Sequence, residues 1–266
     1  MIRGCEIAYE VAADVSGPAD STFVWGHGLT SSRAGEAVFP LLDFDRLAMR
    51  RTIVRYDARG HGDSGDFTHP SEGNWAELAF DQVALIDQLG FDRVALGGAS
   101  MGAATALHSA LLLGERVERL LLVIPPTGWE ARQAQIDQYE TMASIVETRG
   151  VEPLVAGVRA TPPPGPFNDD EDWTERRIST LRGADPARLA AVFRGTGHAD
   201  LPSPDQLQTI GVPTLVLAWT GDPVHPVATA ERLGELLPNV EVSIASTMEQ
   251  FSTWTGSAES FLSRRR

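Results

Sequence analysis

The feature that most constrains the fold is a serine set between two glycines, where a predicted strand meets a predicted helix. Arg93–Leu96 is apolar and strand-like, Met101–Leu113 is small, apolar and helix-like, and the pentad Gly98–Gly102 (GASMG) joins them. Gly-x-Ser-x-Gly alone is a weak pattern, but between a strand and a helix it is typical of a sharp turn that exposes the serine. The helix behind the turn favours negative charge at its N-terminus. The pentad therefore predicts a βα unit with a nucleophilic Ser100, and an ordinary glycine-rich turn is the alternative.

Strand-like and helix-like runs alternate along most of the chain. The predicted helices are Asn74–Leu89, Met101–Leu113, Thr229–Leu237 and Phe251–Leu262. The predicted strands are Glu6–Val15, Ser21–Trp25, Thr52–Tyr56, Arg93–Leu96, Val117–Ile124, Val212–Trp219 and Val240–Ala245. Alternation of this kind predicts an α/β fold with a mainly parallel central sheet flanked by helices.

The alternation stops between Pro126 and about Ile210. This stretch has helix-like runs at Trp129–Thr148 and Glu171–Leu181, a proline-rich turn at residues 161–166 and no convincing strand. We interpret it as a helical lid inserted into the α/β core. The predicted domains are a first part of the core at 1–126, the lid at 127–205 and a second part of the core at 206–266.

Composition excludes several classes of partner. The formal net charge is −14, which disfavours binding to nucleic acid and to anionic membranes, because both are polyanions. Cys5 is the only cysteine, and no run approaches the roughly 18 apolar residues of a membrane span. The first residues lack the apolar core of a signal peptide. We expect a cytoplasmic protein that takes a small molecule and uses no cofactor or metal; the oligomeric state stays open.

Further candidate groups follow other predicted strands, at the edge where open α/β sheets bind ligands. Acyl transfer needs preorganised donors for an oxyanion, and we assign these to the backbone amides of Leu29 and Met101. Gly28 and, from the lid, Trp129 are predicted to contact substrate. The lid aromatics Tyr139, Phe167, Trp173 and Phe193 are further candidates for lining the pocket, with packing in the core as the alternative.

Two more loops follow strands in the same way. Asp222 comes directly after Leu215–Thr220 and is the candidate acid that orients a base, with capping of the next helix as the alternative. The stretch Asp57–Ser64 lacks the Lys-Ser/Thr of a phosphate-binding loop, so we interpret it as a structural loop braced by Arg59 and Asp57.

Taken together, these segments resemble the α/β-hydrolase superfamily over nearly the whole chain, and Asp57–Ser64 resembles its branch of enol-lactone hydrolases, carboxylesterases and cofactor-free haloperoxidases. The resemblance implies Ser100 as nucleophile and Asp222 as acid. It also implies a Gly-His pair after the last strand, but no histidine follows His225. Gln250 falls where that histidine is expected, with Glu249 before it.

The candidates for a replacement base are the six histidines and Glu249, whose carboxylate is a much weaker base than an imidazole. His225 is the sharpest candidate, because it lies three residues after Asp222. His198 ends the insertion and is the second. His108 lies about 12 Å along the helix from Ser100, which puts it out of reach. His27 and His61 belong to structural loops, and His69 lies in a surface loop.

The leading hypothesis is a serine hydrolase that cleaves a carboxylic ester or lactone through an acyl-enzyme on Ser100, with His225 as a non-standard base. The alternative is a catalytically impaired relative of the same superfamily that binds a small molecule or serves as a scaffold. A sequence in which the histidine was replaced is a third possibility.

Overall fold

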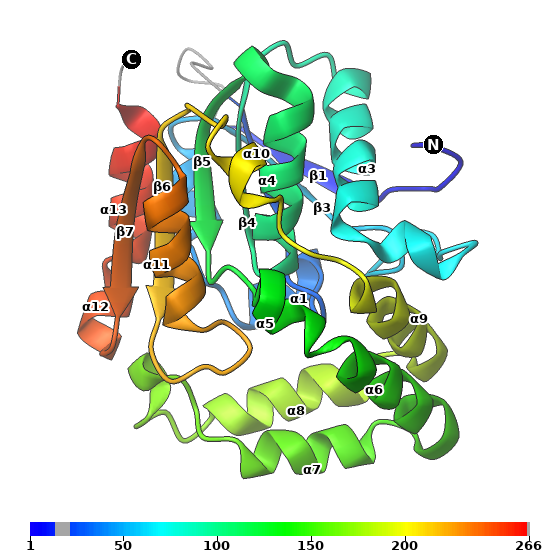
Figure 1. Cartoon of the computed structure of the whole chain (residues 1–266). Coiled ribbons are helices and arrows are strands. Elements are labelled where there is room, and N and C mark those ends of the chain that lie inside the picture. Colours follow the sequence, from blue (N-terminus) through cyan, green and yellow to red (C-terminus); the bar gives the residue numbers. More distant parts are fainter. Residues whose placement is uncertain (14–21, 265–266) are drawn as a thin grey trace.

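A single sheet of seven strands forms the centre of the part of the chain that this computed structural model describes, residues 1–13 and 22–264 (Figure 1). The strand order is β1-β3-β2-β4-β5-β6-β7, with β1 antiparallel to β3 and every other neighbouring pair parallel. The strands are β1 (Tyr9–Ala12), β2 (Thr22–Gly26), β3 (Thr52–Tyr56), β4 (Val94–Ala99), β5 (Val117–Val123), β6 (Thr214–Trp219) and β7 (Val240–Ala245). The predicted α/β architecture is confirmed. Residues 14 and 15 of the first predicted strand lie outside the described residues.

Burial along the strands follows their place in the sheet. The central strands β2, β4 and β6 are buried at every residue, which explains their nearly continuous apolar sequences. The edge strands β1 and β7 are mostly exposed and carry polar residues. β3 lies on one side of β2 and β4 lies on the other, so the order in which the chain adds strands to the sheet reverses after β3. The point of reversal lies between the neighbouring strands β2 and β4. Ligands bind at such switch points in open α/β sheets.

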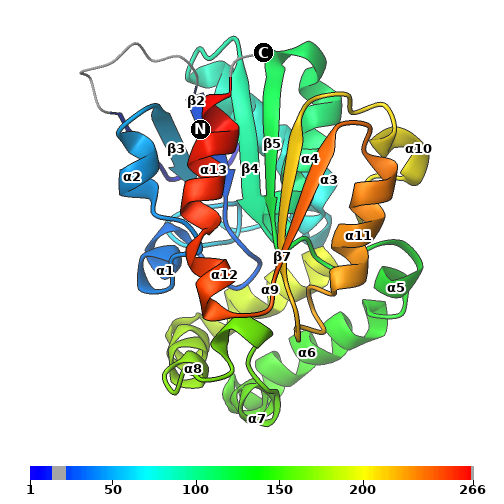
Figure 2. The same ribbon diagram turned by 90° about the vertical axis from the view of Figure 1, so that its left-hand side faces the viewer.

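Helices cover both faces of the sheet (Figure 2). One face carries α1 (Arg33–Val38), α2 (Phe44–Ala48) and α13 (Trp254–Ser263), and the other carries α3 (Trp75–Gln88), α4 (Met101–Leu113) and α11 (Val227–Leu236). Each face has its own apolar cluster. Shorter elements are α10 (Pro204–Leu207), α12 (Met248–Ser252) and the 3₁₀ turns η1 (Pro70–Gly73) and η2 (Gly114–Arg116). No helix within the described ranges combines the length and the apolar character needed to cross a bilayer.

Between β5 and β6 the chain is helical, and its helices lie across the carboxyl ends of the strands (Figure 1). They are α5 (Trp129–Gln133), α6 (Ile136–Arg149), α7 (Glu152–Ala160), η3 (Gly165–Phe167), α8 (Trp173–Gly183) and α9 (Pro186–Gly197). The sequence predicted one helix over Trp129–Thr148, and the structure has two, because a turn interrupts it. The prediction omitted α7 and α9. For α9 the signal was present, since Asp185 caps its first turn and Pro186 opens it.

Four large aromatic side chains of this helical segment are buried, whereas Trp129 on α5 is half-buried. Phe167 and Trp173 stack at 4.3 Å between ring centroids and belong to the apolar cluster of the face covered by α13. Tyr139 and Phe193 form a smaller cluster between α6 and α9. Of the alternatives for these four aromatics, packing in the core is the one that the structure shows.

Candidate active site

Ser100 sits on a sharp turn between β4 and α4. Its backbone has φ 51° and ψ −112°, a left-handed conformation that costs a non-glycine residue free energy and is concentrated at functional sites. Glycines on either side allow the close packing around this turn. A Cβ atom on Gly98 would lie 2.3 Å from the backbone of Gly102, and one on Gly102 would lie 2.0 Å from the carbonyl oxygen of Gly26. The pentad therefore folds as the sequence predicts, with the serine side chain at the edge of the sheet.

The hydroxyl of Ser100 meets an imidazole from a distant loop. Ser100 Oγ lies 2.8 Å from Nε2 of His225, and Nδ1 of the same ring lies 2.8 Å from Oδ2 of Asp222. The loop that carries both residues, which we call the Asp222–His225 loop, follows β6 and precedes α11. A serine, an imidazole and a carboxylate in this order form the geometry of a catalytic triad. The structure thus brings together the three residues that the sequence proposed.

Both carboxylate oxygens of Asp222 accept hydrogen bonds. Oδ1 accepts from the backbone N–H of Val224 at 2.9 Å and of His225 at 3.3 Å, and Oδ2 accepts from the indole N–H of Trp219 at 2.9 Å. Burial alone would raise the pKa of Asp222, but His225 and these hydrogen bonds hold that pKa well below its usual range. Asp222 is therefore ionised at neutral pH and suited to hold Nδ1 of His225 protonated, which leaves Nε2 as the acceptor facing Ser100.

The Asp222–His225 loop is also tied to the start of the helical segment. The carbonyl oxygen of Val224 accepts the backbone N–H of Thr127 at 3.2 Å and its hydroxyl at 3.1 Å. Gln135 in turn donates to the Thr127 hydroxyl at 3.3 Å. Sequence reasoning missed Thr127, because the contact joins residues nearly a hundred positions apart.

The loop after β2 lies against Ser100. A Cβ atom on Gly28 would be 3.7 Å from Cβ of Ser100. The carbonyl of Gly28 accepts from Nδ1 of His27 at 2.8 Å and from Ser31 N–H at 3.0 Å. Because the N–H and C=O of a trans peptide point in opposite directions, these bonds fix the direction of the Leu29 N–H. The candidate oxyanion donor therefore belongs to a peptide unit that is firmly held.

Two buried histidines brace this loop. Nε2 of His27 accepts the backbone N–H of Ala58, so its Nδ1 is the donor to Gly28. His61 lies with Nε2 2.7 Å from the carbonyl oxygen of Leu29 and Nδ1 2.9 Å from that of Arg59. Burial lowers the pKa of both histidines. The lowered pKa favours the neutral form of each ring, and in that form His61 donates to only one of its two carbonyl neighbours.

The other histidines lie elsewhere. His198 is exposed at the end of α9 and His69 is exposed before η1. His108 contacts the carbonyl oxygen of Asp200 at 2.9 Å. Of the two candidate bases from the sequence, His225 and His198, it is His225 that contacts the Ser100 hydroxyl in the described part of the chain.

Gln250, at the position where the family resemblance implies a histidine, has a structural contact instead. Its Oε1 accepts from the backbone N–H of Ser246 at 2.7 Å and of Thr247 at 3.2 Å, and Thr247 caps the first turn of α12 in return. This is a capping box, whose Thr-x-x-Gln pattern is legible in the sequence. Gln250 therefore stabilises the start of α12.

Trp129 is the first residue of α5 and has φ 54° at its backbone. Its indole N–H donates to the carbonyl oxygen of Pro202 at 3.0 Å, and its backbone N–H to Asp200 at 2.8 Å. The side chain is partly buried against the core. Contact with substrate stays a prediction for Trp129, as for Gly28.

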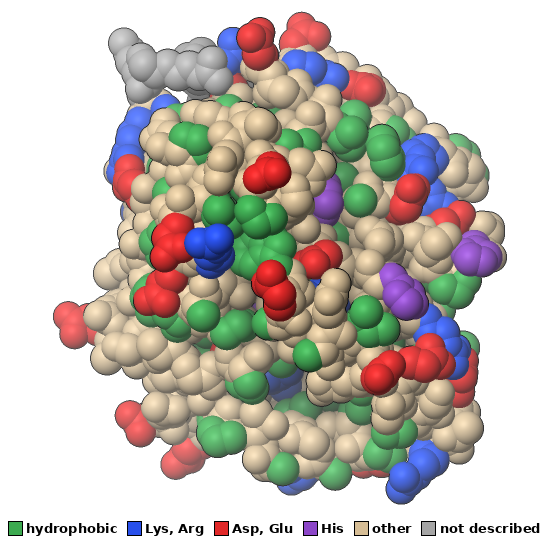
Figure 3. Space-filling model, in the orientation of Figure 1, with side chains coloured by type: hydrophobic (Ala, Val, Ile, Leu, Met, Phe, Trp, Pro, Cys, Tyr) green, Lys and Arg blue, Asp and Glu red, His purple; other side chains and the backbone are tan. Residues whose placement is uncertain are grey.

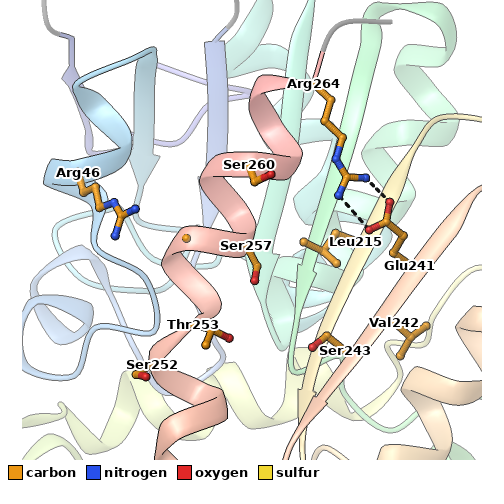
Figure 4. Close-up of a pocket in the computed structure, with 11 residues that line it drawn as sticks. Arg46, Leu215, Glu241, Val242, Ser243, Ser252, Thr253, Ser257, Ser260 and Arg264 are labelled. Carbon is orange, nitrogen blue, oxygen red and sulfur yellow. Dashed lines mark hydrogen bonds and ion pairs between the residues drawn. The ribbon is translucent and has the colours of Figure 1, made fainter.

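A cavity of about 580 Å³ lies between β7 and α13, away from the cluster of Ser100, His225 and Asp222 (Figure 4). Five of its eleven lining residues are serine or threonine, and the ion pair of Arg264 with Glu241 stands at one end. It shares no lining residue with the Ser100 cluster. On the face of Figure 3, acidic and basic side chains are interspersed with apolar ones. Within the described part of the chain, no three His, Cys, Asp or Glu side chains gather as a metal site requires.

Comparisons with known proteins identify relatives of the whole core. Residues 23–247 match the model of the alpha/beta hydrolase family. A 3-oxoadipate enol-lactonase of Acinetobacter baylyi is 28% identical over 219 residues, which cover 80% of this chain and 79% of the relative. A putative carbamate hydrolase of Caulobacter sp. is 29% identical over 226 residues, covering 82% of this chain and 80% of the relative.

Solved structures show the same fold. The enol-lactonase from Burkholderia xenovorans superimposes with a TM-score of 0.79 at 23% identity and covers 99% of this chain and 98% of its own. A hydrolase from Pseudomonas aeruginosa superimposes with a TM-score of 0.78 at 25% identity, covering 97% and 94%.

Proposed function

Because this chain belongs to the alpha/beta hydrolase family and is a hydrolase, we propose that it cleaves a carboxylic ester or lactone through an acyl-enzyme on Ser100. The observation that carries the proposal is the 2.8 Å contact between Ser100 Oγ and Nε2 of His225. A serine hydroxyl becomes a strong nucleophile only when a base takes its proton. His225 fills the role of that base, and Asp222 stabilises the imidazolium that forms.

The proposed reaction proceeds in two halves. Nε2 of His225 takes the proton of Ser100 as Oγ bonds to the substrate carbonyl carbon, and the N–H groups of Leu29 and Met101 stabilise the oxyanion. The intermediate collapses, and His225 gives the proton to the departing alkoxide. Water then loses a proton to His225 and attacks the acyl carbon. The second intermediate collapses to release the acid, and His225 gives its proton to Oγ of the departing Ser100. In a lactone the alkoxide stays attached to the acyl group, so ring opening yields one hydroxy acid.

The nature of the substrate is supported by the relatives. The curated relatives include enol-lactonases and putative carbamate hydrolases. Lactones and carbamates are both cleaved by attack of a nucleophile at a carbonyl carbon. We propose a small ester or lactone for this chain, bound beneath a lid formed by residues 127–205, with the core at 1–126 and 206–266. The proposal includes a cytoplasmic location. It also includes no nucleic-acid partner, for which the net charge of −14 is the support.

The test is hydrolysis of p-nitrophenyl esters and simple lactones by matched variants. Ser100→Ala and His225→Ala should each abolish turnover, and a fluorophosphonate probe should label Ser100 stoichiometrically in the unmodified protein. His198→Ala is the matched control, because its exposed side chain is the other candidate base, and it should keep full activity. Full activity in His225→Ala would refute His225 as the base. Absent labelling would favour a protein that binds its ligand without hydrolysing it.

A further inference from the structure

The Asp222–His225 loop needs an anchor outside itself. Because Asp222 and His225 lie three residues apart on one segment between β6 and α11, their mutual hydrogen bond fixes the imidazole relative to the loop only. Ser100 lies on a different element, at the start of α4. A contact from the rigid core to the loop is therefore required to hold Nε2 of His225 at hydrogen-bonding distance from Ser100.

We propose that Trp219 is this anchor, a positioning residue that aims the imidazole of His225 at Ser100 through the carboxylate of Asp222. The inference rests on the proposed function of the Ser100, His225 and Asp222 cluster. Trp219 is the last residue of β6, and its Nε1 lies 2.9 Å from Oδ2 of Asp222, the same oxygen that faces Nδ1 of His225.

The indole ring of Trp219 is held rigidly. It is 3% exposed and stacks on Trp254, with ring centroids 5.8 Å apart and planes at 17°. The rings of Phe167 and Trp173 meet it edge-on, at centroid distances of 5.5 and 5.8 Å. Contacts on two sides leave the ring no room to swing, because protein cores are close-packed. Nε1 is thus a donor at a fixed point of the core.

The chemistry of the indole makes the direction of this contact unambiguous. An indole N–H donates and never accepts, and a carboxylate oxygen offers two lone pairs. With one lone pair of Oδ2 taken by Trp219, the other is left for the Nδ1 proton of His225. The indole therefore selects the rotation of the carboxylate, and the carboxylate selects the rotation and the tautomer of the imidazole.

Trp254 supplies a matched control within the same cluster. It is 1% exposed and stacks on Trp219, but its own Nε1 is buried with no hydrogen-bond partner within the described residues. Replacing either tryptophan by phenylalanine removes similar aromatic volume from the same cluster. Only Trp219→Phe removes a donor to Asp222.

The kinetic test compares Trp219→Phe with Trp254→Phe. In Trp219→Phe we expect kcat for ester hydrolysis to fall about 10-fold, the low end for losing a hydrogen bond to a charged group, with KM unchanged. The rate of fluorophosphonate labelling of Ser100 should fall by the same factor. Trp254→Phe should keep the kcat of the unmodified protein. Equal kcat values in the two variants would overturn the proposal.

A second measurement keeps both tryptophans in place, so it does not depend on whether a tryptophan variant folds. In ¹H–¹⁵N spectra of the isotope-labelled protein, assigned by triple-resonance methods, the indole N–H of Trp219 should resonate downfield of that of Trp254. Asp222→Asn should move the Trp219 resonance upfield and leave that of Trp254 in place. A Trp219 resonance that ignores Asp222→Asn would overturn the proposal.

The outcomes also separate this inference from the function on which it rests. Inactive His225→Ala together with fully active Trp219→Phe would refute the anchor and leave the proposed function intact. Full activity in His225→Ala would refute both.

Discussion

Asp222 and His225 lie three residues apart on one loop, with Oδ2 of the acid 2.8 Å from Nδ1 of the base. Two of the three members of the proposed triad are therefore local to each other, and only Ser100 comes from a distant part of the chain. Holding the loop in place then becomes the structural problem that the surrounding residues solve.

Removing the charge of Asp222 should cost most of the activity. We expect Asp222→Asn to lower kcat on the order of 10⁴-fold, as the loss of the corresponding charge does in serine proteases. The pKa of Asp222 is held low, so the residue is fully ionised across the neutral range and the charge is always present. Initial rates of p-nitrophenyl ester hydrolysis measure the loss. Asp172→Asn, at an exposed position before α8 whose side chain makes no capping bond, is the control and should be fully active.

Placing a histidine at position 250 should not raise activity. Gln250 caps α12, and both oxygens of Asp222 already have donors. We expect Gln250→His to keep the esterase rate and to lose about 1 kcal/mol of stability from the broken cap. Rates and urea denaturation measure the two effects, and Gln250→Ala should lose similar stability. A large gain in rate for Gln250→His would show that a histidine after β7 can still serve as the base.

The hydroxyl of Thr127 should matter for catalysis more than for stability. Thr127→Val removes the hydroxyl that donates to the Val224 carbonyl and keeps the backbone N–H that also donates there. A hydrogen bond is worth about 1 kcal/mol, so we expect kcat/KM to fall about fivefold. Thr229→Val is the control, at a buried position on α11. Equal kcat/KM in both variants would contradict the expected role.

Glu36 should make the protein less stable as the pH rises. Burial raises its pKa to about 7, against hydrogen bonds from Trp25 and the charge of Arg55, from an ordinary value of 4.5. Because the pKa of this carboxyl group is raised on folding, the folded state binds more protons than the unfolded state at pH values between 4.5 and about 7. The stability that protonated Glu36 contributes is complete below pH 4.5 and is lost as the pH rises through 7, by about 3 kcal/mol in all.

Glu36→Gln stays uncharged and should remove this dependence. The free energy of unfolding, measured in urea at pH 5 and pH 8, should fall less with pH in Glu36→Gln than in the unmodified protein. Glu130→Gln, at an exposed position on α5, should follow the unmodified protein. Parallel pH profiles for Glu36→Gln and the unmodified protein would contradict the raised pKa.

Gly102 should tolerate no side chain. A Cβ atom there would lie 2.0 Å from the backbone oxygen of Gly26, whereas one on Gly183 in α8 would meet nothing within 4 Å. We expect Gly102→Ala to lose about 3 kcal/mol of stability or more and Gly183→Ala to be neutral or slightly stabilising. Thermal denaturation of the two variants makes the comparison, and equal melting temperatures would contradict the close approach.

Much of the fold was accessible from sequence because the strands of this sheet are short apolar runs with clear ends. The Gly98–Gly102 pentad fixed one strand–helix junction, and His225 stood out because it lies so near Asp222. The broken helix over Trp129–Thr148 and the missed α7 show the limit, since turns within a helical region leave a weaker pattern than changes from strand to helix.

The contacts that hold the site were beyond the sequence. Trp219 looked like the end of a buried strand, and nothing in the pattern indicated that its indole reaches Asp222. Thr127 and His61 likewise contact carbonyl groups far along the chain. Such contacts depend on where loops meet in three dimensions. The role of Gln250 is different, because the Thr-x-x-Gln pattern of its capping box is readable in the sequence.

The loop between β6 and α11 has a consequence for how the proposed site could be rebuilt in another protein of this fold. A stretch of seven residues, 220 to 226, carries both the proposed base and the proposed acid, so one short graft would transfer the pair with its internal geometry. Under this proposal the segment after β7 supplies no group to proton transfer, and Gln250 there caps α12.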